Sequence, residues 1–142
     1  MTPINPDRLV AWRRQLHQYP EIGWTEFVTT ATIIQTLREM GLAVKPGPLI
    51  MRRESILGRD EQLVAKAIEA AKAKGVSPAQ LDEMDGLTGC MAELDTGIPG
   101  PTFGFRFDID CVAVQESNDR EHRPSAEGFR LPVLWPNARL RP

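Results

Sequence analysis

The sequence predicts an α/β fold. Amphipathic helical patterns fill most of the first 84 residues, and two short runs of β-favouring residues follow, at about Thr88 to Leu94 and Thr102 to Ile109. A turn rich in Gly and Pro separates the two runs. Helices that precede strands in this order favour α/β layers over a helical bundle. The length of 142 residues suits one ordinary domain with a real core.

The first expected helix covers about Pro6 to Gln18. Asn5 is a suitable N-cap, Pro6 is favoured in the first helical position, and Pro20 stops the pattern. Apolar residues recur at helical spacing between these limits, at Leu9, Trp12 and Leu16.

Three further helices are expected. One begins near Thr25 and ends at Gly41, and another lies within residues 60–75, where acidic residues come first and Lys precedes a Gly. Ser77, with Gln80 three residues later, predicts a capping box and a short fourth helix. Pro and Gly punctuate residues 44–61, which we therefore expect to form a loop.

Charge and composition exclude several classes of function. The 17 basic and 19 acidic residues are spread along the chain and leave a formal charge of -2, so no nucleic-acid or membrane-surface footprint is present. No membrane helix or signal peptide is expected, which makes the cytoplasm the default location.

Cys90 and Cys111 are interpreted as small core residues. His17 and His122 lack a second ligand at metal-binding spacing, so packing or solvent-exposed roles are favoured.

The segment "FRFDIDCV" carries the candidate chemistry. In a strand, Asp108 and Asp110 share one face, and adjacent carboxylates of this kind occur at metal and acid/base sites. The alternative interpretation is structural: one Asp caps the following turn, and the other pairs with Arg106 or stays solvated. The residues alone leave both interpretations open.

Two segments resemble the metal-dependent amidohydrolases and peptidases related to aminoacylase and carboxypeptidase. The first is "WRRQLHQYPEIGWTEFVTTATIIQTLREMGL", and the second is "TGIPGPTFGFRFDIDCVAVQE". The "LTGCMAELDTG" run, the acidic and Ala-rich stretch before it, and the "HRP...GF" loop narrow the resemblance to the A-type subunits of the p-aminobenzoyl-glutamate hydrolases. The resemblance covers nearly all residues up to Arg130.

The resemblance implies an incomplete catalytic domain, namely residues 1–130 as the N-terminal portion of a three-layer α/β/α zinc-peptidase-like fold. In that family two divalent ions, Zn or Mn, activate a water that attacks the amide of p-aminobenzoyl-glutamate or a related N-acyl amino acid, a step in folate catabolism. Asp110 matches the carboxylate that orients the site. Asp108 stands where relatives with His-x-Asp have a metal ligand, which leaves its role open. The established ligands and the catalytic Glu are expected beyond Arg130.

Beyond Arg130 the sequence departs from the family. The expected motif His-Ala-Cys-Gly-His-Asp is missing, and "LPVLWPNARLRP" stands in its place. Residues 135–142 and a stop can be encoded as TGG CCG AAT GCA CGC CTG CGG CCA TGA. Read from the second base, these codons give Gly-Arg-Met-His-Ala-Cys-Gly-His and the start of an Asp codon. We therefore expect residues 131–142 to be an out-of-frame tail.

Two functions follow from these observations. In the first, the chain is a truncated amide hydrolase that binds no metal and is inactive alone. In the second, it is a non-enzymatic binding or regulatory module that pairs with a homologous full-length subunit. Neither predicts a nucleic-acid or membrane partner.

Overall fold

A computed structural model describes residues 5–17 and 19–113 of the chain. These residues fall into two compact units, one of which contains the first helix and the other residues 21–112. The residues beyond 113, including His122 and the expected tail, lie outside the described residues.

Helix α1 (Pro6–His17) makes up most of the first unit. The Asn5 side chain accepts hydrogen bonds from the backbone N–H of Asp7, at 3.0 Å, and of Arg8, at 3.4 Å, which confirms the predicted cap. The Arg8 guanidinium lies 4.5 Å from the ring centre of Trp12, one turn further along. The predicted last residue of this helix, Gln18, lies outside the described residues.

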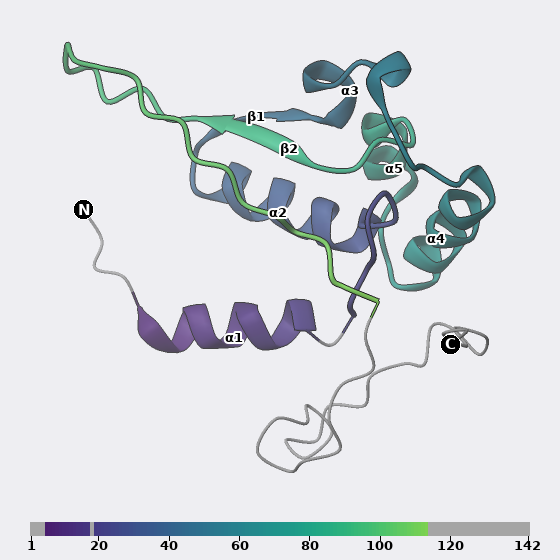
Figure 1. The fold of residues 1–142 in the computed structure, drawn as a ribbon. Coiled ribbons are helices and arrows are strands. Elements are labelled where there is room, and N and C mark those ends of the chain that lie inside the picture. The colour runs from purple at the N-terminus through teal and green to yellow at the C-terminus, as the bar shows by residue number, and fades with distance from the viewer. Residues whose placement is uncertain (1–4, 18, 114–142) are drawn as a thin grey trace. The chain divides into compact units, whose positions relative to one another are not determined.

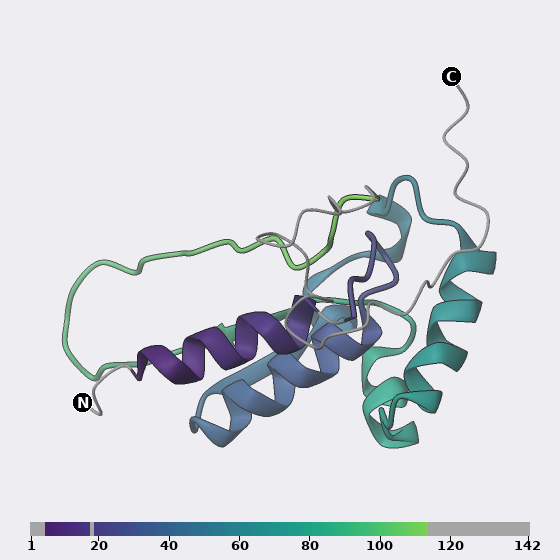
Figure 2. The same cartoon turned by 90° about the horizontal axis from the view of Figure 1, so that it is seen from below.

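The second unit is a two-stranded antiparallel sheet covered by helices. Strand β1 (Ala43–Pro46) pairs with β2 (Cys90–Glu93), in a register that sets Ala43 opposite Glu93 and Pro46 opposite Cys90. Helix α2 (Phe27–Glu39) packs against both strands, and α4 (Glu61–Ala73) and α5 (Pro78–Met84) pack against α2 (Figure 1, Figure 2). The prediction of mixed helix and strand is confirmed.

The core lies where α2 meets α4 and α5. Phe27, Met84 and Leu87 are almost completely buried. Phe27 and Met84 belong to one apolar cluster, together with Ala31, Ile34, Val64, Ala71, Val76 and Leu81. Burial of this apolar surface is the main term that holds these helices on the sheet.

Helices α4 and α5 begin where their caps predict. The Asp60 carboxylate accepts from the backbone N–H of Gln62 and Leu63, and α4 starts at the next residue. Ser77 and Gln80 form the expected capping box at the start of α5.

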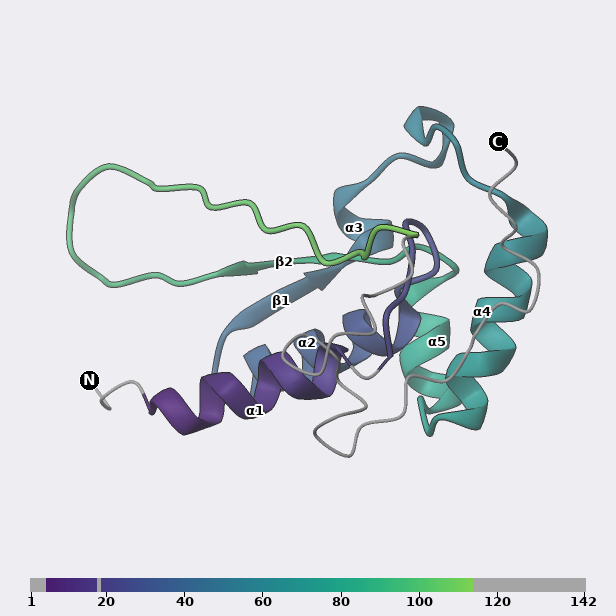
Figure 3. The ribbon, with the colours of Figure 1, turned by 60° about the horizontal axis from the view of Figure 1, so that its bottom comes forward.

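The structure corrects two predictions. Residues 44–61 are not only a loop, because they contain most of β1, a single helical turn α3 (Gly47–Ile50) and a 3₁₀ turn η1 (Arg53–Ser55). The strand predicted at Thr102 to Ile109 is absent from the described residues. After β2 the chain makes a wide loop and returns toward the start of α2 (Figure 3). A strand requires a partner along its backbone, and no described residue pairs with 102–109.

Candidate functional site

The two aspartates predicted as a pair have different surroundings. The Asp108 side chain is 69% exposed and forms an ion pair with Arg106, Nη2 to Oδ1 at 2.6 Å, where the Arg106 side chain is 88% exposed. This ion pair is the one that the structural alternative names, and a catalytic role for Asp108 stays a prediction. Such an exposed pair adds little to stability.

Asp110 lies beside the loop of residues 21–26, which precedes α2. Its Oδ2 atom would be 3.7 Å from a Cβ placed on Gly23, an ordinary contact distance. The N–H of the next residue, Cys111, donates to the carbonyl oxygen of Glu21 at 2.8 Å, and Ile22 and Cys111 form an isolated parallel bridge. Segments far apart in the sequence therefore meet at Asp110.

Glu21 caps α2 from a distance. Its Oε1 atom accepts from the backbone N–H of Val28 at 3.1 Å, and its Oε2 atom accepts from Thr29 at 2.8 Å. The residue in the usual capping position, Glu26, makes no such bond. A carboxylate at a helix N-terminus satisfies free N–H groups and interacts favourably with the helix dipole. The buried Glu21 side chain therefore fixes the loop to the first turn of α2.

Glu26 connects the same turn to the entry of β2. Its side chain is buried, and its Oε2 atom accepts a hydrogen bond from the Thr88 hydroxyl at 2.8 Å. One turn along α2, Thr30 Oγ1 accepts from the Gly89 N–H at 2.9 Å. Two polar contacts thus join α2 to the residues that lead into β2.

Burial raises the pKa of Glu26, because the charged carboxylate loses solvation. The Thr88 hydrogen bond and a backbone hydrogen bond act in the opposite direction, while the negative charges of Asp110 and Glu21 raise the pKa further. The carboxylates of Asp110 and Glu21 therefore both act on the Glu26 carboxyl group at this point.

The loop itself has an unusual backbone. Trp24 adopts φ = 69°, in the left-handed region that side-chain-bearing residues rarely use. Its indole N–H donates to the Leu57 carbonyl oxygen at 3.0 Å, and the Thr25 hydroxyl donates to the Ile22 carbonyl at 2.6 Å. These contacts hold the loop in a conformation that would otherwise be costly.

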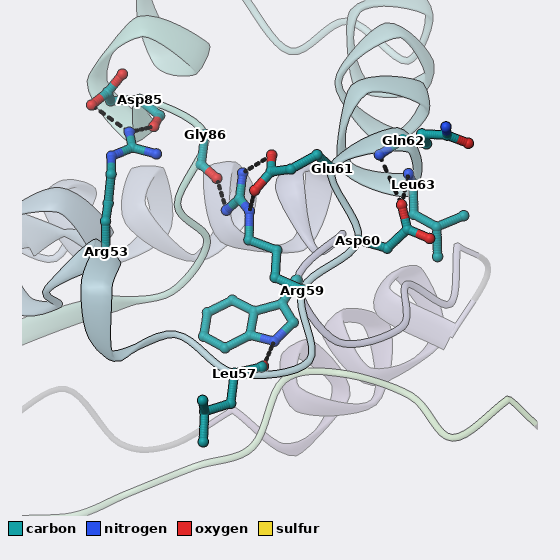
Figure 4. Close-up of polar contacts among 10 residues, drawn as sticks. Arg53, Leu57, Arg59, Asp60, Glu61, Gln62, Leu63, Asp85 and Gly86 are labelled. Carbon is teal, nitrogen blue, oxygen red and sulfur yellow. Dashed lines mark hydrogen bonds and ion pairs between the residues drawn. The ribbon is translucent and has the colours of Figure 1, made fainter.

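The segment that carries Leu57 is held in turn by two arginines (Figure 4). Arg59 donates to the Gly86 carbonyl at 2.5 Å and pairs with Glu61 at 2.7 Å. Arg53 pairs with the Asp85 carboxylate at 2.6 Å and also donates to the Asp85 backbone carbonyl. The loop at residues 21–26 is therefore supported by the irregular segment before α4.

These residues do not by themselves fit a metal site. Among residues 5–17 and 19–113, no group of three or more His, Cys, Asp or Glu side chains could hold a metal ion. Cys90 and Cys111 are free thiols, and burial raises the pKa of each. Cys90 packs against the core, as its interpretation as a small core residue expected.

In the sequence, the Glu21 to Glu26 segment is part of a longer motif, and no residue pattern within it predicts a role for these side chains. Its importance comes from contacts with Thr88 and Cys111, far along the chain. Polar residues are frequent in the sequence just before the amphipathic helix. This pattern indicates an N-terminal cap, but it does not identify a partner far along the chain.

Comparison with known proteins gives the following relatives. No family model matches the chain. A homologue of the A-type subunit of p-aminobenzoyl-glutamate hydrolase, from Haemophilus influenzae, is 43% identical over 127 residues, or 89% of this chain and 30% of that protein. An indole-3-acetyl-aspartic acid hydrolase from Enterobacter agglomerans is 38% identical over 85% of this chain and 28% of its own length.

A crystal structure of a relative is also similar to this chain in its fold. The aminobenzoyl-glutamate utilization protein from Klebsiella pneumoniae matches with a TM-score of 0.69 and 34% identity, over 75% of this chain and 27% of that one. In the part of the chain that is described, no helix is long and apolar enough to cross a bilayer. The chain spans about three tenths of the length of its relatives, and over that span it is, by sequence and by fold, a relative of amidohydrolases of the aminobenzoyl-glutamate hydrolase type.

Proposed function

We propose that this chain supplies the Asp110 region of an amide hydrolase that acts on p-aminobenzoyl-glutamate or a related N-acyl amino acid. The observation that carries the proposal is its similarity, over nearly nine tenths of its length, to proteins named as hydrolases of such amides. In this proposal Asp110 is the carboxylate that orients the site, and Asp108 is dispensable because it pairs with exposed Arg106.

The substrate class follows from the names of two relatives. One name contains p-aminobenzoyl-glutamate and the other indole-3-acetyl-aspartic acid, which are both amides between an aromatic acyl group and an acidic amino acid. We propose the same class of amide here. Its carboxylates require positive partners, which are expected outside the described residues.

The metal requirement is also a proposal. Relatives of this type would use two divalent ions, Zn or Mn, yet the described residues offer no group of ligands. We therefore propose that the ligands and the general base belong to the part of the family's sequence that would follow Arg130, which residues 131–142 do not supply. The 142-residue chain alone should bind no metal ion of this kind and should be inactive.

A chimera tests this function. Residues 1–130 are joined to the matching remainder of the Haemophilus relative, and hydrolysis of p-aminobenzoyl-glutamate is measured with added Mn or Zn. We expect activity in the chimera, a large loss on Asp110→Asn, and little change on the matched control Asp108→Asn. An inactive but folded chimera would overturn the proposal, and so would equal losses in the two variants. Hydrolysis by the 142-residue chain itself would overturn its predicted inactivity.

The tail at residues 131–142 is proposed to be an out-of-frame reading of the same gene. The support is that residues 135–142 can be encoded by permitted codons which, read from the second base, spell the missing His-Ala-Cys-Gly-His motif. Sequencing independent DNA from codon 125 past the stop tests it. A long frame that begins with this motif is expected one base out of register, and its absence would refute the proposal.

A second candidate function is a module that pairs with a homologous full-length subunit in the cytoplasm. It is favoured by the exposure of large apolar side chains along the segment after β2, where Phe103, Phe105 and Phe107 are 75%, 81% and 79% exposed. Co-expression with a full-length homologue tests it. A stable one-to-one complex on native mass spectrometry would support the module, and two separately eluting proteins would contradict it.

A further inference from the structure

Among the described residues, the backbone around Asp110 is joined to the rest of its unit at the loop of residues 21–26. Residues 102–109 have no strand partner among the described residues, and the ion pair of Asp108 with Arg106 is internal to that segment. The hydrogen bond that joins this segment to the rest of its unit is donated by Cys111, directly after Asp110. The residue that fixes the acceptor of this hydrogen bond therefore also fixes the backbone next to Asp110.

The acceptor is the Glu21 carbonyl, and the same residue is fixed at its other end. Its carboxylate accepts the N–H groups of Val28 and Thr29, so the side chain cannot move without uncapping α2. The side chain is buried, which restricts it to this geometry. Glu21 thus connects a rigid helix to the residue that follows Asp110.

The neighbouring residues are not placed to do this. Gly23 lies near Asp110 but has no side chain to hold it. Glu26 contacts Thr88 at the entry of β2, whereas Cys111 donates to Glu21. The Trp24 indole binds Leu57, in the segment before α4.

We propose that Glu21 is a positioning residue for Asp110: its carboxylate is locked on the first turn of α2, and its carbonyl holds the backbone at Cys111. The consequence for catalysis rests on the function proposed above. The positional effect itself does not, and can be measured in the chain without any reaction.

The first test is hydrogen exchange of the Cys111 amide in the 142-residue protein. Glu21→Ala is expected to speed exchange of this amide by at least about tenfold relative to amides inside α2, such as that of Ile34. Ile34→Val is the matched control, because a general loss of core packing should speed all amides of the unit alike. If Glu21→Ala changes Cys111 and Ile34 by the same factor, the proposal is overturned. Should Glu21→Ala fail to fold, Glu21→Gln keeps one acceptor oxygen and serves instead.

The second test checks that the Glu21 carboxylate lies close to Cys111 in the folded protein. Burial raises the pKa of the Cys111 thiol, its own backbone hydrogen bond lowers it, and the charges of Asp110, Glu21 and Glu26 raise it further. Glu21→Gln should therefore shift the pH profile of Cys111 alkylation to lower pH. Cys90 is the internal control, since Arg38 and not Glu21 acts on its pKa. An unchanged Cys111 profile, or an equal shift at Cys90, would contradict this close approach, on which the proposal depends.

The third test concerns activity. In the chimera, Glu21→Gln should lower kcat with little change in KM, because in the proposed role Asp110 orients the site and does not bind the substrate. If the chimera is inactive from the start, the proposed function fails while the exchange and alkylation results still decide the role of Glu21. An unchanged kcat, together with a displaced Cys111, would refute the link between position and catalysis.

Discussion

The buried bond between Thr88 and Glu26 allows a quantitative test of the electrostatics around the loop. Thr88→Val removes the hydroxyl but keeps the shape of the side chain, and Glu26→Gln keeps the acceptor oxygen but removes the charge. Both residues are more than nine-tenths buried, so water cannot replace the lost partner easily. The two single variants and the double variant form a thermodynamic cycle.

The expected magnitude depends on the charge of Glu26. A hydrogen bond to a charged group contributes about 1.5 to 3 kcal/mol and a neutral one about 0.5 to 1.5 kcal/mol. At pH 7.5 we therefore expect Thr88→Val to be more destabilising in the wild type than in Glu26→Gln, by roughly 1 to 1.5 kcal/mol. The difference should shrink as Glu26 becomes protonated.

The direction with pH follows from the raised pKa of Glu26 in the folded chain. A carboxyl whose folded pKa lies above its unfolded value takes up protons more readily when folded. Its stabilising contribution is therefore complete below the ordinary pKa of 4.5 and is lost as the pH rises through the folded pKa. The wild type should lose stability relative to Glu26→Gln over that window, by about 1.4 kcal/mol for each pKa unit of elevation.

Urea unfolding followed by circular dichroism at pH 4 and at pH 7.5 measures the four proteins. The reasoning would be refuted if Thr88→Val had the same effect on the free energy of unfolding in both backgrounds and at both pH values. It would be refuted equally if the wild type gained stability relative to Glu26→Gln on going from pH 4 to pH 7.5.

Three further predictions use the same unfolding measurement. Gly47→Ala should destabilise by about 1 to 3 kcal/mol, because a Cβ there would lie 2.6 Å from the Leu87 carbonyl oxygen, and an unchanged midpoint would contradict this close approach. Phe27→Ala should cost about 3 to 5 kcal/mol, since the ring is fully buried, and a loss below about 1 kcal/mol would show that the core is elsewhere. Asp60→Ala should cost about 0.5 to 2 kcal/mol through loss of the α4 cap, whereas Asp60→Asn should retain most of it.

The helices were predictable because their signals are local. Ser77 and Gln80 form a capping box within four residues, and Asn5 caps α1 from the adjacent position. Strands depend on partners that periodicity does not reveal. The β-favouring pattern at Thr102 to Ile109 therefore predicted a strand that finds no partner among the described residues, while β1 was missed because Lys45 and Pro46 look like a loop.

The candidate site was predictable only in part for the same reason. The sequence singled out Asp108 and Asp110 as a pair and also offered Arg106 as a partner for one of them, and Arg106 forms an ion pair with Asp108. The groups around Asp110 come from Glu21 and Glu26, which no spacing rule connects to it. Contacts between distant segments follow from tertiary packing, and a single sequence does not encode them in any local pattern.

The pairing of β1 with β2 limits how the residues between these two strands can change in evolution. Pro46 pairs with Cys90, so residues 47–89 form one long connection, here called the excursion, that begins and ends at the same end of the sheet. The entropy of closing such an excursion grows only slowly with its length, by about 0.6 kcal/mol for each doubling. What retains its helices is the apolar surface of α2 that Val64, Ala71 and Met84 cover. Homologues can therefore lengthen, shorten or exchange the excursion without disturbing the strand ladder, provided that the new segment still shields Phe27 from water.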